Sequence, residues 1–175
     1  MTAVHKANVL RVSDGLYLEC VRSVAARYPQ VQYEERIIDA MAALLVRDAQ
    51  RFDVVVTTNQ FGDILTDIGA GLVGGLGLAP GLCVGERQAM AQATHGSAPD
   101  IAGRNIANPY AMIMSGQMLL AWLARKNGDQ SAAAAGDRIA TAVAQTIAEG
   151  RHLTPDLGGR ATTTQMGDAI AAAVQ

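Results

Sequence analysis

Two aspartates four residues apart, Asp63 and Asp67, are the first candidates for chemistry in this sequence. On a helix this spacing puts both carboxylates on one face, where like charges repel unless a cation lies between them. The pair follows a valine-rich run at 52–57 that predicts a strand buried on both faces, and ligand crevices in parallel sheets form beyond the ends of such strands. Carboxylate oxygens suit Mg²⁺ or Mn²⁺, although a bare D-x-x-x-D spacing more often marks a solvated helix face.

A lysine and a glycine-containing loop are the next candidates. Lys6, in VHKAN, could transfer a proton if its surroundings lower its pKa or aim its ammonium group, although an isolated lysine is usually a surface residue. The loop HGSAPDIAG at 95–103 has small residues that let a backbone approach a ligand closely. Within it, Asp100 could accept hydrogen bonds from a ribose diol and repel a 2′-phosphate, which favours NAD over NADP. The loop lacks the GxGxxG fingerprint, and its composition alone would fit an ordinary surface loop.

The elements that must position these residues alternate in the first part of the chain. Hydrophobic periodicity predicts strands at 4–10, 31–38 and 52–57 and helices at 14–28, 40–49 and 61–73. This alternation favours an α/β architecture with parallel strand pairing.

The pattern changes character at 73–75, where we place a boundary between two parts of the chain. Residues 74–85 are rich in glycine and predict an irregular connection. The sequence after them predicts one strand, at 88–94, and helices at 110–126, 132–149 and 163–174.

Composition excludes several functional classes. Half of the 175 residues are hydrophobic, 17% are charged and the net charge is −2, which excludes a disordered chain and a nucleic-acid binder driven by positive charge. Two cysteines, Cys20 and Cys83, are too few for a disulfide scaffold. We find no export signal and no stretch typical of a membrane span, so we expect a cytoplasmic protein with no membrane partner.

Five motifs in order resemble those of one enzyme family. VHKAN, NQFGDILTD, GLVGGLGLAP, HGSAPDIAG and IANP together resemble the metal-dependent β-decarboxylating dehydrogenases, the isocitrate/isopropylmalate dehydrogenase family. Each motif is modest alone, but their joint order and spacing make chance agreement very unlikely. The resemblance implies that family's α/β fold, which is not a Rossmann domain, and the C-terminal half only of an enzyme about twice this length. It places 1–73 in the small, dimer-forming lobe with the metal and substrate residues, and 74–175 in the large lobe with the NAD-binding loop.

The resemblance also implies roles for individual residues. Asp63 and Asp67 match the carboxylates that bind Mg²⁺ or Mn²⁺, while Lys6, the proton-transfer residue, and Asp39, a third metal-site acid, match catalytic residues that serve the neighbouring subunit's site. Asn8 matches a residue near the nicotinamide. The residues matching those around the adenosine part of the cofactor are His95, Gly96, Ser97, Ala98, Asp100, Ile101 and Asn108.

The implied reaction is the oxidative decarboxylation of a 2-hydroxy acid with reduction of NAD. His5, before the lysine, favours isocitrate or a close relative, with 3-isopropylmalate, homoisocitrate and tartrate as alternatives. Gln92 departs from the family's frequent acidic residue, which puts one contact to the nicotinamide half in question. The family's N-terminal half, with its substrate-binding arginines, is missing from these 175 residues. The alternative is therefore a truncated, non-catalytic module for nucleotide binding or dimerisation, and in either case we expect exposed sheet edges and apolar surface.

Overall fold

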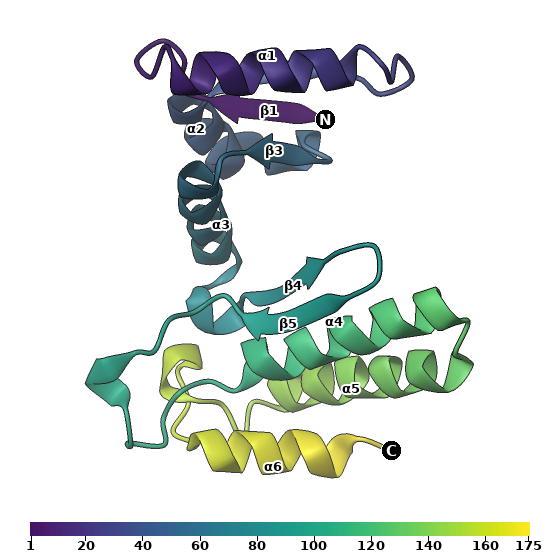
Figure 1. Cartoon of the computed structure of the whole chain (residues 1–175). Coiled ribbons are helices and arrows are strands. Elements are labelled where there is room, and N and C mark those ends of the chain that lie inside the picture. Colours follow the sequence, from purple (N-terminus) through teal and green to yellow (C-terminus); the bar gives the residue numbers. More distant parts are fainter. The chain divides into compact units, whose positions relative to one another are not determined.

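The protein is described by a computed structural model that covers residues 1–175 and divides into two compact units, Met1–Leu72 and Val73–Gln175 (Figure 1). Each unit has its own sheet, helices and core. None of the helices is both long and apolar enough to cross a membrane.

A parallel sheet organises the first unit. Its strands are β1 (Thr2–His5), β2 (Glu34–Ile37) and β3 (Val55–Thr57), in the order β2–β1–β3. Both neighbours pair with β1 in parallel, which confirms the expected parallel pairing. The carboxyl ends of all three strands therefore lie along one edge of the sheet.

Three helices complete the first unit: α1 (Ser13–Ala25), α2 (Ile38–Asp48) and α3 (Asn59–Val73), with a 3₁₀ turn at Ala49–Arg51. α1 connects β1 to β2 on one side of it, and α2 then connects β2 back across the sheet to β3 on the other side of β1. Because crossovers between parallel strands are right-handed, this reversal of direction puts the two helices on opposite faces of the sheet. The core consists of Val4 from β1, Met41 from α2 and Leu65 from α3.

Two expectations for the first unit are wrong. The strand expected at 4–10 ends at His5, because the chain turns sharply and the Lys6 carbonyl accepts hydrogen bonds from the amides of Val9 and Leu10. The strand expected at 52–57 is shorter and is not buried on both faces. Val54 is 53% exposed and Val55 37% exposed, because β3 is an edge strand that the rest of the unit does not cover.

The second unit contains an antiparallel hairpin and three helices. The hairpin strands are β4 (Pro80–Val84) and β5 (Ala89–Ala93). The helices are α4 (Tyr110–Asn127), α5 (Gln130–Glu149) and α6 (Thr163–Ala173), and single 3₁₀ turns lie at Leu76–Leu78, Pro99–Ile101 and Pro155–Leu157. The core of this unit lies between α5 and α6 and consists of Ala142, Val143, Met166 and Ile170.

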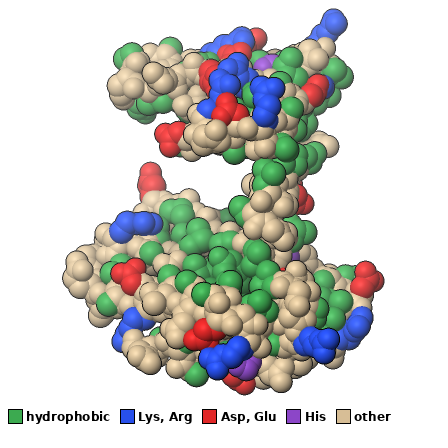
Figure 2. All heavy atoms as spheres, turned by 180° about the vertical axis from the view of Figure 1, so that it is seen from behind, with side chains coloured by type: hydrophobic (Ala, Val, Ile, Leu, Met, Phe, Trp, Pro, Cys, Tyr) green, Lys and Arg blue, Asp and Glu red, His purple; other side chains and the backbone are tan.

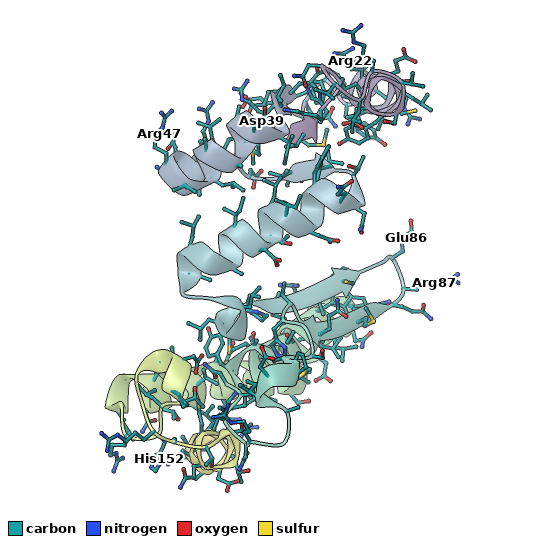
Figure 3. All side chains as sticks on the ribbon, turned by 90° about the vertical axis from the view of Figure 1, so that its left-hand side faces the viewer. Arg22, Asp39, Arg47, Glu86, Arg87 and His152 are labelled. Atoms are coloured by element: carbon teal, nitrogen blue, oxygen red, sulfur yellow. The ribbon has the colours of Figure 1, made fainter.

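The irregular connection expected at 74–85 is wrong, because it contains β4. The glycines in this segment hide any local alternation of polar and apolar residues, and the strand is held by contacts distant in sequence. Gly81 donates its amide to the hydroxyl of Ser115 on α4 at 3.1 Å. At the hairpin turn, which carries the labelled Glu86 and Arg87 in Figure 3, the Lys126 ammonium donates to the carbonyls of both residues.

Apolar side chains are widely exposed, as expected. Figure 2 shows hydrophobic side chains gathered on one face of the second unit. The large hydrophobic residues that are more than half exposed in either unit include Val9, Val12, Leu16, Val46, Val54, Val73, Val84, Met90 and Met112.

Candidate functional site

The carboxyl edge of the parallel sheet brings the first group of candidate residues together. Lys6 follows β1 directly, Asp39 lies in the first turn of α2 just after β2, and α3 begins at Asn59 just after β3. In an open α/β sheet, this edge is where ligands bind. Residues far apart in sequence thus share one place in the fold.

Lys6 and Asp39 form an ion pair. The Lys6 ammonium donates to both carboxylate oxygens of Asp39, and the side chains are 24% and 65% exposed respectively. This hydrogen bond, with the positive charge of Lys6, holds the pKa of Asp39 below its usual range. In Figure 3, Asp39 lies at the start of α2 and Arg47 toward its other end. The lysine is thereby aimed along one direction by an acid that is itself open to solvent.

The residues that flank Lys6 are arranged differently from one another. The His5 ring is turned back on its own segment, because its Nδ1 accepts the Ala7 amide at 3.1 Å. Asn8 is exposed in the turn after β1. Lys6 itself is anchored through its backbone amide, which donates to the buried carboxylate of Asp14 at 2.6 Å.

Asp63 and Asp67 lie on the exposed face of α3. The opposite face is buried through Phe61 and Leu65, so the helix presents both carboxylates one turn apart. Asn59 donates to Asp63 Oδ2 at 3.1 Å. The chain contains no group of three histidine, cysteine, aspartate or glutamate side chains that could hold a metal ion, so Asp39 does not join this pair within one chain. Two exposed carboxylates fit a hard divalent ion that takes its other ligands from water, substrate or another chain.

A cavity of about 760 Å³ in the second unit gathers the other candidates. It is lined by small and apolar residues of the 95–108 loop, together with segments 76–77, 156 and 163. The expected cofactor residues among its lining are His95, Gly96, Ser97, Ala98, Ile101 and Asn108. Asp100 is exposed and is not among the lining residues, and Asn8 belongs to the first unit.

The loop has an unusual backbone at two of its positions. Ala98 has φ 45° and Asn105 has φ 54°, both in the left-handed region that residues other than glycine rarely adopt. Asn105 is held there by the start of α6: its carbonyl accepts the Thr163 amide at 2.9 Å and its side chain accepts the Thr164 hydroxyl at 3.1 Å. The loop shape therefore depends on a helix almost sixty residues further along.

Asn108 is 8% exposed and both ends of its amide are engaged within the unit. Its Nδ2 donates to Asp156 Oδ2 at 2.9 Å, and its Oδ1 accepts the Tyr110 amide at 2.9 Å. A ligand in the cavity would thus meet the backbone of Asn108 more readily than its side chain. A Cβ added at Gly77 would lie 3.1 Å from Asp156 Oδ2, so the glycine permits a close approach of these segments.

Sequence reasoning assigned no role to the other nine residues that line the cavity. These are Leu76, Gly77, Ala102, Gly103, Asn105, Ile106, Ala107, Asp156 and Thr163. Asp156 belongs to the TPDLGG turn, where the glycines and proline indicate a turn but give no sign of a partner 48 residues away. The cavity has the size and the small, apolar lining of a pocket for part of a nucleotide, which the loop residues fit.

Comparisons with known proteins agree on one family. The family model described as isocitrate/isopropylmalate dehydrogenase matches residues 1–170. The chain is 49% identical over 97% of its length to isocitrate dehydrogenase [NAD] catalytic subunit 5, mitochondrial, of Arabidopsis thaliana, covering 44% of that protein. It is also 49% identical over 98% of its length to 3-isopropylmalate dehydrogenase of Archaeoglobus fulgidus, covering 50%.

The solved structures add the fold. The crystal structure of isocitrate dehydrogenase from Methylococcus capsulatus matches 99% of the chain and 50% of that protein, with a TM-score of 0.84 and 48% identity. The chain thus spans about half the length of the relatives it matches.

Proposed function

Because the chain belongs to the isocitrate/isopropylmalate dehydrogenase family, we propose that it is part of an enzyme that oxidatively decarboxylates a 2-hydroxy acid. We propose isocitrate or a close relative as the substrate and NAD as the electron acceptor. The observation that carries the proposal is the carboxyl edge of the sheet, where the Lys6–Asp39 pair and the start of the Asp63–Asp67 helix lie together. The 49% identity to a relative named as an NAD-dependent isocitrate dehydrogenase supports NAD as the cofactor. The identity to a 3-isopropylmalate dehydrogenase is equally high, so the preference for isocitrate rests on His5.

Asp63 and Asp67 are the proposed metal ligands of this chain. Their exposed oxygens would hold Mg²⁺ or Mn²⁺, and Asp39 would contribute a third carboxylate to the site of a neighbouring subunit. A divalent ion bound there supplies Lewis-acid polarisation of the substrate's hydroxyl oxygen.

Lys6 is the proposed proton-transfer residue. Its ammonium group lies against Asp39, so the direction of its side chain is set before any substrate binds. A lysine held this way can hand a proton to, or take one from, an oxygen of a substrate placed beside it. Asp39 would then act in catalysis by aiming Lys6.

The 95–108 loop is the proposed cofactor cradle. Its small residues and the backbone of Asn108 would take the adenosine part of NAD, whose nicotinamide ring supplies the hydride acceptor when bound. Asp100, exposed outside the cavity lining, would act on the ribose only from the rim. Asn8 is the proposed contact near the nicotinamide.

A homodimer is part of the proposal. Asp39 is 65% exposed and does not group with Asp63 and Asp67 in its own chain. Both facts are what a contribution to a neighbouring subunit's site would require. We place residues 1–73 in the small, dimer-forming lobe and residues 74–175 in the large, NAD-binding lobe.

The test is an NAD⁺ reduction assay on the full-length protein with Mn²⁺ and a panel of isocitrate, homoisocitrate, 3-isopropylmalate and tartrate. We expect turnover that is fastest with isocitrate or homoisocitrate and is abolished by a chelator. Lys6→Ala should lower kcat by at least about 100-fold, within the usual contribution of general acid–base groups. The matched control is Lys126→Ala, because Lys126 is the chain's only other lysine and lies over the Trp122 ring in the second unit. No turnover of any of the four acids would refute the proposal.

A non-catalytic nucleotide-binding module is the second candidate. The chain spans about half the length of its relatives. The cavity around the 95–108 loop lies wholly within the second unit, whereas the metal-ligating residues form no group of three. Retained NAD⁺ binding in a full-length protein that turns over none of the four acids would favour this candidate.

A further inference from the structure

Asp14 is a buried acid that the proposed chemistry does not use. It lies in the first turn of α1 and is only 4% exposed. Burying a carboxylate is costly unless it is hydrogen-bonded. Its partners therefore indicate what the residue is for.

The carboxylate of Asp14 binds the backbone of Lys6. Its Oδ2 accepts the Lys6 amide at 2.6 Å, a short bond of the charge-assisted kind. The Ser13 hydroxyl lies 3.4 Å from the other oxygen, at the limit of a hydrogen bond. The start of α1 adds the positive end of a helix dipole, which favours a negative charge there. The principal hydrogen bond of this buried acid is thus made to the segment that carries the lysine.

The other side of the Lys6 backbone is held as well. Its carbonyl accepts the amides of Val9 at 2.9 Å and Leu10 at 2.8 Å. The Leu10 carbonyl in turn accepts the Asp14 amide at 3.0 Å, which closes a ring of hydrogen bonds between the turn and α1. The Lys6 Cα is fixed from both directions, and only the side-chain torsions remain free.

We propose that Asp14 is a positioning residue for Lys6: its carboxylate fixes the backbone from which the lysine side chain reaches Asp39. Two acids thus position Lys6 together: Asp14 binds its backbone amide and Asp39 binds its ammonium group. The proposal rests on the proposed function, in which Lys6 transfers the proton. Without the hydrogen bond to Asp14, Lys6 keeps its ion pair with Asp39, but the backbone that carries its side chain is no longer held in place.

The experiment compares variants of the full-length enzyme in the NAD⁺ reduction assay. Asp14→Ala should lower kcat by about 10- to 100-fold, the effect of misplacing a reacting group by about 1 Å, with KM for the acid and for NAD⁺ unchanged. Asp14→Asn keeps an acceptor but loses its charge, so kcat should fall by a smaller, severalfold amount. On a Lys6→Ala background neither substitution should lower kcat further, because the residue that Asp14 positions is gone.

The matched control is Tyr17→Phe, one turn further along α1. Its hydroxyl donates to the Val56 carbonyl at 2.7 Å, so the substitution weakens the attachment of α1 to the sheet without touching Lys6. It should lower the Tm and leave kcat unchanged. Equal losses of kcat in Tyr17→Phe and Asp14→Asn would overturn the proposal, and so would additive losses in the double variants.

Hydrogen exchange separates this proposal from the proposed function. Exchange at the Lys6 amide should speed up in the order wild type, Asp14→Asn, Asp14→Ala, while the amides of β3 stay unchanged. If Asp14→Ala does not fold, Asp14→Asn alone decides: faster Lys6 exchange with a lower kcat supports the proposal, and a wild-type kcat overturns it. If the wild type turns over no acid, the proposed function fails. The exchange rates then still show whether Asp14 anchors Lys6, and unchanged Lys6 exchange contradicts the anchor itself.

Discussion

Single residues in this chain act through partners that are distant in sequence. Lys6 and Asp39 are 33 residues apart, yet the ammonium group of one lies on the carboxylate of the other. Asn108 and Asp156 are 48 residues apart and share a 2.9 Å hydrogen bond. The sequence indicates which residues are chemically capable, whereas these bonds determine in which direction each one faces.

The metal assignment is tested at one residue. Asp63→Asn removes one charged oxygen ligand while keeping the size of the side chain, so the Mn²⁺ concentration for half-maximal activity of the full-length enzyme should rise by at least about 10-fold. A titration of activity with Mn²⁺ measures this. Asp53→Asn, at an exposed position just before β3, is the control and should leave the titration unchanged. An unaltered Mn²⁺ requirement in Asp63→Asn would rule out the assignment.

The raised pKa of Tyr33 predicts that the free energy of unfolding falls at high pH. Burial, and then its hydrogen bond to Glu35 at 2.8 Å, raise its pKa from 10.0 to about 12. Arg22, labelled in Figure 3, pairs with both oxygens of the same Glu35 carboxylate at 2.7 Å. A tyrosine with a raised pKa keeps its proton longer in the folded state, so its stabilising effect is complete below pH 10 and is lost as the pH rises to about 12.

The measurement is the free energy of unfolding of wild type and Tyr33→Phe across this range. The wild type should lose more stability than the variant between pH 10 and about 12. The difference in phenolate absorbance between the two proteins, which comes from Tyr33 alone, should appear near the upper end of the same range. Parallel stability curves for the two proteins would contradict the expected shift.

At the scale of elements, local pattern accounts for the helices and for the approximate places of β1, β2, β3 and β5, but not for β4. The helices after residue 109 were expected at 110–126, 132–149 and 163–174, and they lie at Tyr110–Asn127, Gln130–Glu149 and Thr163–Ala173. α5 and α6 follow a 3.6-residue pattern, and α4 is a long run of mostly apolar residues. Both are local signals. β4 has no such signal, because its pairing with β5 and its attachment to α4 are tertiary contacts.

Ser115 tests how the hairpin is attached to α4. Its fully buried hydroxyl accepts the Gly81 amide and lies within hydrogen-bond reach of the Gln92 and Ala111 carbonyls. Ser115→Ala leaves the Gly81 amide without its acceptor, so the free energy of unfolding should fall by about 1–3 kcal/mol in a urea titration. Thr141→Ala is the control, since its hydroxyl bonds to the carbonyl four residues earlier at an exposed position, and its effect should stay within about 0.5 kcal/mol. Equal effects of the two substitutions would mean that Ser115 does not hold the hairpin.

At the scale of the whole molecule, the two units carry different shares of the candidate chemistry. The cavity around the 95–108 loop is built entirely from residues of the second unit. The Asp63–Asp67 pair finds no third metal-ligating side chain in the chain. A ligand of the cavity therefore meets a more complete site than a metal ion does.

Calorimetry on the 175-residue chain tests this difference. We expect a binding signal with NAD⁺ and a much weaker one with Mn²⁺, because a divalent ion would find two carboxylates and otherwise only water. Asn108→Ala should weaken NAD⁺ binding, because it removes the link from the loop to Asp156. Tight Mn²⁺ binding without NAD⁺ binding would contradict the assignment of the two sites.

The sequence by itself determined the α/β class, the family and the set of candidate residues, because motifs and periodicity are local properties of the chain. Only the tertiary structure decided which partners those residues contact. Lys6 forms an ion pair with Asp39, Asn108 donates a hydrogen bond to Asp156, and Asp100 lies outside the cavity lining. The physical reason is that each of these outcomes depends on contacts between segments tens of residues apart, and local sequence does not encode which segments meet.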